Sequence, residues 1–254
     1  MIRVETDGRG VATVTLARPE KRNALDRATI DALTEAAATL GADGAVRAVV
    51  LTGEGAAFCA GGDLGWMREQ MGASAAERAE GARALAGMLS ALDAMPVPLI
   101  GRVNGDALGG GVGMACVCDV AVAAPGARFG LTEVRLGLIP ATIGPYVVAR
   151  IGPAVRRVFM SGRVFGAEEA ARLGIVAGVA EDLDAAVAAE VAPYLAAAPG
   201  AVASAKALAR RLAGAPDAET VEASIAALVG RWETEEARDG IGAFFDKRKA
   251  PWAG

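Results

Sequence analysis

Apolar and polar residues follow two different periods along the first fifty positions. Residues 11–16 (VATVTL) alternate as a half-buried strand does, and residues 46–52 (VRAVVLT) form a second run rich in β-branched side chains. Asn23 or Asp26 can cap a helix between them. The apolar side chains of that helix recur at helical spacing: Ile30, Leu33, Ala37 and Leu40. Strand, helix and strand in this order predict a β-α-β unit with a right-handed crossover.

The middle and the end of the chain carry the helical period over longer stretches. Residues 74–95 place apolar side chains on one helical face, and Pro96 and Pro98 end this helix. That face consists of Leu85, Met88, Leu89 and Leu92. After Pro140 the pattern is helical throughout, with alanine-rich segments separated by glycine or proline, so a strand-rich core with a helical appendage is expected. The predicted helices span residues 153–160, 167–173, 183–198, 201–212 and 220–237.

Two glycine-rich junctions connect apolar runs to short predicted helices. The first is residues 57–64 (AFCAGGDL), and the second runs from the apolar residues 97–103 through the triplet Gly109, Gly110 and Gly111. Such a junction points unpaired backbone N–H groups at one spot, with the positive end of a helix behind them. Two junctions in one domain predict two N–H donors for one carbonyl oxygen. The spacing does not match a dinucleotide-binding fingerprint.

Composition narrows the classes of function. The chain has 254 residues, of which 53% are hydrophobic and 22% charged, so it can bury a large core. Its formal net charge is −4 and it has no run of Lys or Arg longer than three residues, which argues against nucleic acid as a partner. No apolar run is long enough to span a bilayer and no leader precedes residue 11, so no membrane partner and a cytoplasmic location are expected.

Histidine is absent, which excludes a Ser-His-Asp triad, a Cys-His pair and any His-ligated metal or haem. Proton transfer must therefore use a carboxylate, a lysine, a tyrosine or water. The three cysteines, Cys59, Cys116 and Cys118, have neither the spacing nor the partners of a metal site and are interpreted as small apolar core residues. No metal and no separate cofactor are expected.

Several motifs, in order and almost from end to end, identify the chain as resembling the enoyl-CoA hydratase/isomerase family, the crotonase superfamily. They are RPEKRNAL at 18–25, AFCAGGDL at 57–64, PVPLIGRVNGDALGGG at 96–111, CDVAVAAPGARFGLTEVRLGLIP at 118–140 and FFDKRKA at 244–250. The resemblance implies an α/β fold, a spiral of ββα turns in residues 1–195, followed by a C-terminal helical oligomerisation region in residues 196–254. It also implies a homo-oligomer, a trimer or a dimer of trimers, and an acyl-CoA thioester as substrate.

The resemblance also assigns catalytic roles. Gly62 and Gly110 match the two positions whose backbone N–H groups form the oxyanion hole, which holds the thioester oxygen as enolate charge develops. Glu133 matches the second of the family's two catalytic glutamates, which moves a proton at the α-carbon. Partial burial suits this task because it raises the pKa of a carboxylate.

Gly113 departs from the family pattern, because hydratases with two glutamates carry the first of them there. A single carboxylate suffices for Δ3,Δ2-enoyl-CoA isomerases, whose one glutamate matches Glu133. Asp106 is either a substitute holder of water or a turn-capping residue. Dienoyl-CoA isomerases are disfavoured, because their additional aspartate would fall at Ala141.

Local strings at 61–67 (GGDLGWM) and 131–147 (LTEVRLGLIPATIGPYV) most resemble the methylglutaconyl-CoA hydratase branch, which is associated with leucine breakdown. Candidate phosphate ligands are Lys21, Arg22, Lys247, Arg248 and Lys249, and the resemblance adds Ala24, Ala60, Gly62, Asp63, Leu64 and Gly110 as substrate-binding residues. Candidates for the acyl pocket are Trp66, Met67, Met71 and Leu85, and a basic residue at its end, Arg83 or Arg135, would indicate a dicarboxylyl substrate.

The expected function is therefore an enoyl-CoA hydratase that adds water syn to a 2-enoyl-CoA, possible substrates being methylglutaconyl-CoA or a related branched thioester. A Δ3 to Δ2 isomerase that uses the single glutamate is the first alternative. An inactive acyl-CoA-binding oligomer is the second, because the departure at Gly113 permits loss of the chemistry. Glu133 together with both glycine junctions favours an enzyme.

Overall fold

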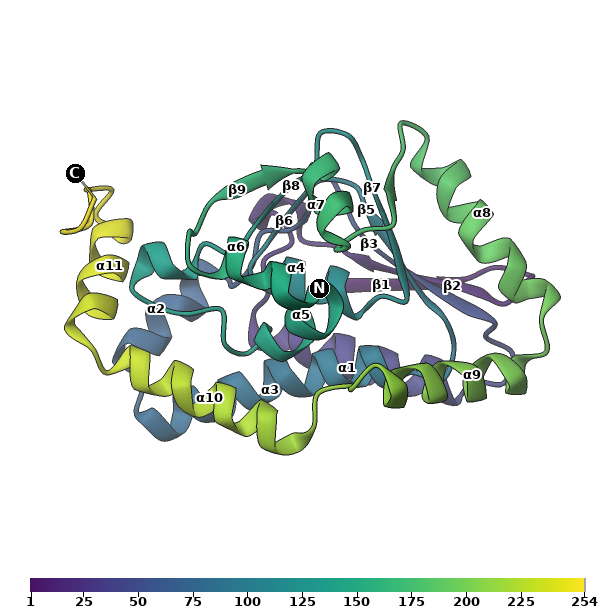
Figure 1. Ribbon diagram of the computed structural model, residues 1–254, viewed down its shortest axis with the longest axis horizontal. Helices are drawn as coiled ribbons and strands as arrows, with labels where there is room; N and C mark the ends of the chain where they lie inside the picture. Colours follow the sequence, from purple (N-terminus) through teal and green to yellow (C-terminus); the bar gives the residue numbers. More distant parts are fainter. Residues whose placement is uncertain (254) are drawn as a thin grey trace.

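The computed structural model describes residues 1–253, whose strands form two sheets (Figure 1). The larger sheet has the order β1-β2-β3-β5-β7-β10, in which β1 is antiparallel to β2 and the other neighbours are parallel. The smaller sheet has the order β4-β6-β8-β9, with β9 antiparallel to β8. The strands of the larger sheet are β1 (Ile2–Thr6), β2 (Val11–Leu16), β3 (Ala48–Gly53), β5 (Leu99–Val103), β7 (Val120–Ala123) and β10 (Gly178–Val179). Those of the smaller sheet are β4 (Ala57–Cys59), β6 (Asp106–Leu108), β8 (Arg128–Gly130) and β9 (Val164–Gly166).

From β3 to β8, consecutive strands alternate between the sheets, and helices follow each pair. β3 is followed by β4, β5 by β6 and β7 by β8, so each turn of the chain adds one strand to each sheet. This arrangement confirms the predicted spiral of ββα turns. The α-helices are α1 (Arg27–Ala42), α2 (Leu64–Gly72), α3 (Ala75–Ala94), α4 (Gly110–Val117), α5 (Gly144–Ile151), α6 (Arg156–Phe159), α7 (Ala167–Leu173), α8 (Leu183–Ala196), α9 (Pro199–Leu212), α10 (Ala218–Trp232) and α11 (Glu235–Phe245). The 3₁₀ turns are η1 (Pro19–Lys21), η2 (Glu133–Leu136) and η3 (Gly152–Val155).

Both faces of the larger sheet are buried, because its strands point alternate side chains into different clusters. In β3, Val49 and Leu51 join the main core with α1 and α3, whereas Val50 packs against α8. Helix α8 contributes Val187 and Val191 to that second cluster. Figure 1 shows α8 on one side of the sheet and α1, α3 and α10 on the other.

The N-terminal predictions are confirmed in detail. Residues 11–16 form β2, and the predicted helix is α1 between the parallel strands β2 and β3. Asp26 is the N-cap, since its side chain accepts a hydrogen bond from the backbone N–H of Thr29. Asn23 has φ 56° and instead donates its side-chain amide to the carbonyl oxygens of Glu54 and Ala57. The helix predicted over residues 74–95 is α3, whose N-cap Ser74 forms a capping box.

The prediction of an all-helical region after Pro140 is wrong. Strands β9 and β10 lie there, and α5 was not predicted. The helix expected over residues 220–237 is two helices, because Thr234 ends the pattern and caps α11 with its side chain. The helix expected over residues 153–160 is the turn η3 followed by the short α6. Strands of two or three residues carry too little periodicity to be found in the sequence.

The terminal helices pack on this same chain. Ile225 of α10 packs with Ala82 and Ala86 of α3, and Ile241 of α11 packs with Leu138 after η2. The predicted boundary between residues 195 and 196 falls at the last turn of α8 and stays a prediction. Within residues 1–253 no individual helix has both the length and the apolarity to cross a bilayer. Helices α8 and α9, which are bent by 111° relative to each other, reach that length and apolarity only when they are taken together.

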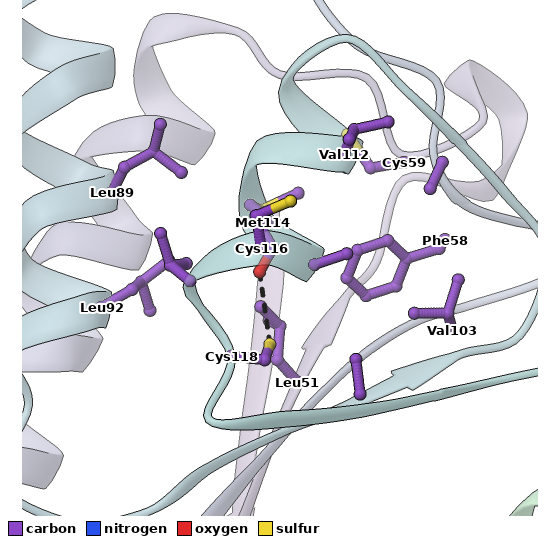
Figure 2. Packing of buried hydrophobic residues seen from close by; sticks show 14 of the residues in the cluster. Leu51, Phe58, Cys59, Leu89, Leu92, Val103, Val112, Met114, Cys116 and Cys118 are labelled. Carbon is purple, nitrogen blue, oxygen red and sulfur yellow. Dashed lines mark hydrogen bonds between the residues drawn. The ribbon is translucent and has the colours of Figure 1, made fainter. Parts of the chain in front are cut away.

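Helix α4 is the centre of the main core (Figure 2). Its residues 111–117 are all buried, and Met114 and Cys116 lie among Leu51, Phe58 and Leu89. All three cysteines are buried as predicted, and burial raises the pKa of each thiol to about 12. The thiols therefore stay protonated and unreactive near neutral pH.

Replacement of Gly111 by alanine is expected to lower the free energy of unfolding by about 3 kcal/mol. A Cβ atom at this position would lie 2.4 Å from the carbonyl oxygen of Cys59, so α4 and β4 would have to separate. Gly87→Ala is the matched control, because Gly87 is exposed in α3 and a Cβ atom there would meet no atom within 4 Å. This control is expected to raise the free energy of unfolding by about 1 kcal/mol. Urea denaturation measures both values, and a Gly111→Ala protein as stable as the native one would contradict the tight packing of α4.

Candidate active site

A cavity of about 160 Å³ lies between α2, α3, α10 and the segment that follows η2. Its walls are mainly apolar, and the backbone of Gly62, Gly109 and Gly110 borders it. The apolar lining side chains are Trp66, Met67, Ala82, Leu85, Leu138, Ile139, Pro140, Ala141, Ile143, Leu228 and Trp232. The polar ones are Gln70, Arg78, Glu133 and Thr142. The cavity therefore combines a hydrocarbon-binding surface with a few polar groups, as sites for small molecules do.

Gly62 and Gly110, the two predicted oxyanion-hole residues, are brought together at this cavity. Gly61 and Asp63 pair with Leu25 through the carbonyl oxygen of Gly61 and the N–H of Asp63. Because successive backbone groups of an extended segment point to opposite sides, the N–H of Gly62 points away from Leu25. Gly110 is the first residue of α4, where an N–H has no partner inside the helix. Neither N–H donates a hydrogen bond to another backbone group within residues 1–253.

Glycine is required beside both donors. Gly61 has φ +92° and Gly109 has φ +49°, a left-handed conformation that L side chains rarely adopt. A Cβ atom at Gly110 would lie 2.8 Å from Cδ1 of Leu25, whereas one at Gly62 would meet no atom within 4 Å. The sequence of small residues in both junctions is thus explained by backbone conformation and close approach.

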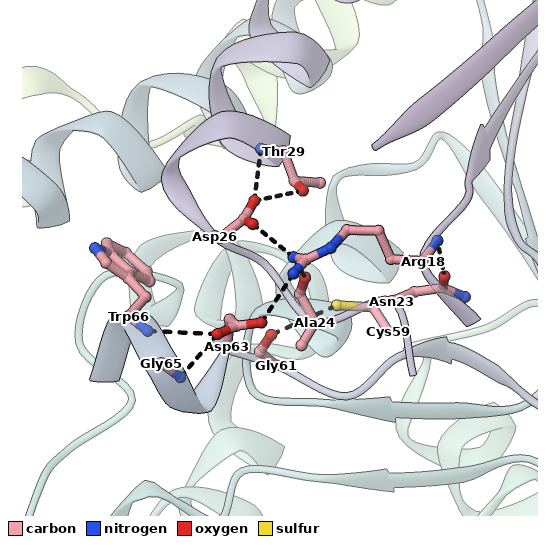
Figure 3. A network of polar contacts seen from close by, with 10 residues as sticks. All are labelled: Arg18, Asn23, Ala24, Asp26, Thr29, Cys59, Gly61, Asp63, Gly65 and Trp66. Carbon is pink, nitrogen blue, oxygen red and sulfur yellow. Dashed lines mark hydrogen bonds and ion pairs between the residues drawn. The ribbon is translucent and has the colours of Figure 1, made fainter. Parts of the chain in front are cut away.

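An ion-pair network anchors the loop that carries Gly62 (Figure 3). Asp63 caps α2, since its Oδ1 accepts hydrogen bonds from the N–H groups of Gly65 at 2.8 Å and Trp66 at 3.4 Å. Its Oδ2 pairs with Arg18 at 3.0 Å, and Arg18 also pairs with Asp26 at 2.8 Å. The network ties the start of α2 to the start of α1. The side chain of Asp63 is therefore committed to holding the loop, and the predicted contact of Asp63 with substrate would have to use its backbone.

Glu133 lies at the first position of η2 and lines the cavity. Its Oε1 is 3.1 Å from the position that a Cβ atom at Gly109 would take, so the carboxylate lies against the second glycine junction. Its Oε2 is buried and has no hydrogen-bond partner within residues 1–253. Burial raises the pKa of this carboxyl group to about 7. A carboxylate with this pKa can both accept and return a proton near neutral pH.

The place of the family's first glutamate is filled by hydrocarbon. A Cβ atom at Gly113 would lie 2.8 Å from Cγ2 of Ile143 and 3.5 Å from Cδ1 of Leu89. Asp106 does not replace it, because it lies in β6 outside the cavity lining and pairs with Arg22 and Arg128. Hydrogen bonds from Arg128 are the main cause that lowers the pKa of Asp106. Asp106 is thus neither a turn cap nor a second carboxylate of this cavity.

The predicted nucleotide-binding residues lie on two adjacent segments. The N–H of Ala60 donates to the carbonyl oxygen of Arg22, and Ala24 precedes the bridge between Leu25 and Gly62. Ala24 is buried, whereas Leu64 is exposed at the start of α2. Of the basic candidates, Lys21 and Arg22 are exposed on the first segment, and Lys247, Arg248 and Lys249 follow α11. Helix α11 contacts α2, where the guanidinium of Arg68 lies 4.4 Å from the ring centroid of Phe245.

Some of the residues predicted for the acyl pocket lie at the cavity, and their contact with an acyl chain stays a prediction. Trp66, Met67 and Leu85 line the cavity, but Met71 is absent from the lining and 37% exposed. Arg83 pairs with Glu222 on the surface, and Arg135 is exposed; neither lines the cavity.

Sequence reasoning missed Arg78, Leu228 and Trp232. The guanidinium of Arg78 donates to the carbonyl oxygens of Gln70 and Met71, pairs with Glu233 and lies 5.4 Å from the ring centroid of Trp232. No local signal marks the α10 residues, because they reach the cavity only through the docking of α10 on α3.

Comparison with known proteins agrees with this geometry. The model of the enoyl-CoA hydratase/isomerase family matches residues 6–254. The crotonyl-CoA hydratase of Syntrophomonas wolfei is 32% identical over 251 residues, which cover 94% of this chain and 93% of that protein. An enoyl-CoA hydratase structure from Mycobacterium avium has a TM-score of 0.88 and 32% identity, and covers 99% of this chain and 98% of that one. Another from Shewanella pealeana has a TM-score of 0.81 and 35% identity, with 99% and 95% covered. The chain therefore belongs to the enoyl-CoA hydratase/isomerase family.

Proposed function

We propose that this enzyme adds water across the C2=C3 bond of a 2-enoyl-CoA thioester. The observation that carries the proposal is the buried carboxylate of Glu133, which faces the same cavity as the free N–H groups of Gly62 and Gly110. This arrangement supplies a proton carrier and a holder for negative charge at one place. The family's hydratase relatives support the same reaction class.

In the proposed reaction the thioester oxygen accepts hydrogen bonds from Gly62 and Gly110. These donors are oriented before the enolate charge develops, and one such donor typically lowers the barrier by about 3 kcal/mol. Glu133 accepts a proton from the attacking water and delivers it to C2, while the water oxygen bonds to C3. Because one residue handles the proton on one face of the substrate, the addition is syn. No cofactor is proposed besides the coenzyme A of the substrate.

The proposed substrates are short or branched 2-enoyl-CoA thioesters. Trp66, Met67 and Leu85 offer an apolar surface for the acyl chain. Arg78 is the lining residue with a cationic side chain. A carboxylate at the far end of an acyl chain would compete with Glu233 for the guanidinium group of Arg78. This observation supports 3-methylglutaconyl-CoA as a substrate, which would place the enzyme in leucine breakdown. Crotonyl-CoA is the simple reference substrate.

A homo-oligomer, a trimer or a dimer of trimers, is also proposed. Helix α9 supports it, because this helix has no buried residue in the single chain. Its Leu208 and Leu212 are 47% and 76% exposed. A neighbouring copy of the chain would remove these side chains from water.

A Δ3 to Δ2 enoyl-CoA isomerase is the second candidate. Ile143 fills the space at Gly113, so the cavity has one carboxylate, which is sufficient to move a proton between C4 and C2. A dienoyl-CoA isomerase is less well supported, because Ala141 presents a methyl group to the cavity. An inactive acyl-CoA-binding oligomer is disfavoured by the pKa of Glu133, which suits proton transfer.

The proposed hydratase predicts loss of the enoyl absorbance from crotonyl-CoA and from 3-methylglutaconyl-CoA in the presence of the native protein. Glu133→Gln is expected to reduce the rate by at least about 100-fold, because the amide cannot carry the proton. Glu35→Gln, an exposed change in α1, is the control and should keep the native rate. No loss with either substrate would refute the hydratase. A 3-enoyl-CoA would then distinguish the two remaining candidates. An increase in the enoyl absorbance indicates an isomerase, and an unchanged absorbance indicates a binding protein.

The rate of hydration is expected to depend on the ionisation of Glu133. Only the carboxylate accepts a proton from water, so kcat/KM should rise about tenfold per pH unit below about pH 7 and level off above it. The midpoint is measured from initial rates with crotonyl-CoA across the pH range. A midpoint near the ordinary glutamate pKa of 4.5 would contradict the desolvated carboxylate.

The free energy of unfolding is expected to depend on the same ionisation with the opposite sign, because deprotonation of Glu133 raises the rate of hydration but lowers stability. The pKa of Glu133 rises from 4.5 to about 7 on folding, so its favourable contribution is complete below about pH 4.5 and is lost as the pH rises through about 7. Relative to the native protein, Glu133→Gln should gain about 2 kcal/mol between about pH 5.5 and about pH 8.5. Urea unfolding at both pH values measures this gain, and a constant difference would exclude the burial of charge.

A further inference from the structure

Thr142 is the second cavity residue with an unpartnered buried oxygen. Within residues 1–253, the buried side-chain oxygens without a hydrogen-bond partner are Oε2 of Glu133 and Oγ1 of Thr142. Both residues line the same cavity, and Thr142 is only 4% exposed. A buried hydroxyl that makes no hydrogen bond reduces stability. Such a group is typical of a site where a ligand or a water completes the bonding.

Backbone hydrogen bonds fix the conformation of the chain around Thr142. Residues 138–143 run from η2 to α5 and form one wall of the cavity. The N–H of Ala141 donates to the carbonyl oxygen of Ile139 at 2.8 Å, and that of Gly144 donates to Ala141 at 2.9 Å. These turns hold Thr142 between two residues that line the same wall, Ala141 and Ile143.

Thr142 is adjacent in sequence to the residue that excludes a glutamate at position 113. Ile143 places Cγ2 2.8 Å from the Cβ position at Gly113, so a carboxylate there would collide with it. The same wall thus removes one polar group from the cavity and supplies another. Arg78, which also lines the cavity, is already bound to backbone carbonyl oxygens and to Glu233.

We propose that Oγ1 of Thr142 positions the water that Glu133 activates, and so takes over part of the task of the missing first glutamate. The inference rests on the proposed hydratase function. A buried water needs two to four polar partners, and one carboxylate leaves one of its hydrogens free. Thr142 accepts that second hydrogen, which directs a lone pair of the water oxygen toward C3.

The step is balanced in atoms and electrons. The water oxygen forms a bond to C3 as its first hydrogen passes as a proton to Glu133. The π electrons of C2=C3 move to the thioester oxygen, giving an enolate held by Gly62 and Gly110. Glu133 then returns the proton to C2, and the second hydrogen remains on the product hydroxyl, still donated to Thr142.

The test compares Thr142→Val, which removes the hydroxyl at nearly constant shape, with Thr142→Ser, which keeps it. Two reactions are followed in each variant. Hydration of crotonyl-CoA requires the positioned water, whereas exchange of the C2 hydrogens of butyryl-CoA in deuterium oxide requires Glu133 and the oxyanion donors alone. Glu133→Gln, which loses both reactions, calibrates the exchange assay.

Thr142→Val is expected to lower kcat for hydration by about 10- to 100-fold, with KM changed less than about threefold. Its deuterium exchange should stay within about threefold of the native rate, and Thr142→Ser should retain both reactions. The melting temperature of Thr142→Val should equal or exceed the native value, because a methyl group replaces an unpartnered hydroxyl.

The outcomes separate the inference from the function on which it rests. Native hydration by Thr142→Val, or an equal loss of hydration and exchange, overturns the role of Thr142 while the hydratase stands. A native protein that exchanges deuterium but hydrates neither crotonyl-CoA nor 3-methylglutaconyl-CoA overturns the proposed function itself, and the role of Thr142 with it.

Discussion

The close approach of α4 to β4 is the constraint on which the site depends. A Cβ atom at Gly111 would lie 2.4 Å from the carbonyl oxygen of Cys59, and residues 111–117 of the helix are all buried. This contact brings the end of β4, which leads to Gly62, against the first turn of α4, which begins at Gly110. Two backbone donors from segments nearly fifty residues apart in sequence are thereby held without any side chain between them. The precision of the proposed oxyanion hole would therefore come from packing of the core.

Burial of the carboxyl group of Glu133 has an energetic cost. The same apolar walls that are proposed to receive an acyl chain remove water from the carboxylate and raise its pKa to about 7. This burial lowers the stability of the protein at neutral pH, and it gives Glu133 a pKa suited to the proposed proton transfer. The ion pairs of Arg18 with Asp26 and Asp63 lie at the other junction, where they keep the loop fixed without placing charge in the cavity.

The sequence was sufficient for the elements with a long period and for the motifs around the glycines. β2, α1 and α3 follow from apolar spacing, and Glu133, Gly62 and Gly110 follow from family motifs. The short strands β9 and β10 and the break at Thr234 escaped prediction, because two or three residues show no period and one cap can divide a continuous pattern. Thr142, Arg78 and Trp232 also escaped, since their positions depend on tertiary packing. The roles assigned to Glu133, Gly62 and Gly110 and to the nucleotide-binding residues stay predictions.

The origin of the cavity walls has an evolutionary consequence. The proposed reacting groups come from residues 62 to 142, whereas Leu228 and Trp232 come from α10, a helix held to the core by Arg78, Glu233 and a small apolar contact. Mutations in α10 can reshape one wall of the cavity while Gly62, Gly110 and Glu133 stay in place. Part of the surface proposed to meet the acyl chain is therefore encoded apart from the proposed reacting groups, so that an exchange of the C-terminal segment between family members is expected to alter substrate preference while conserving the reaction.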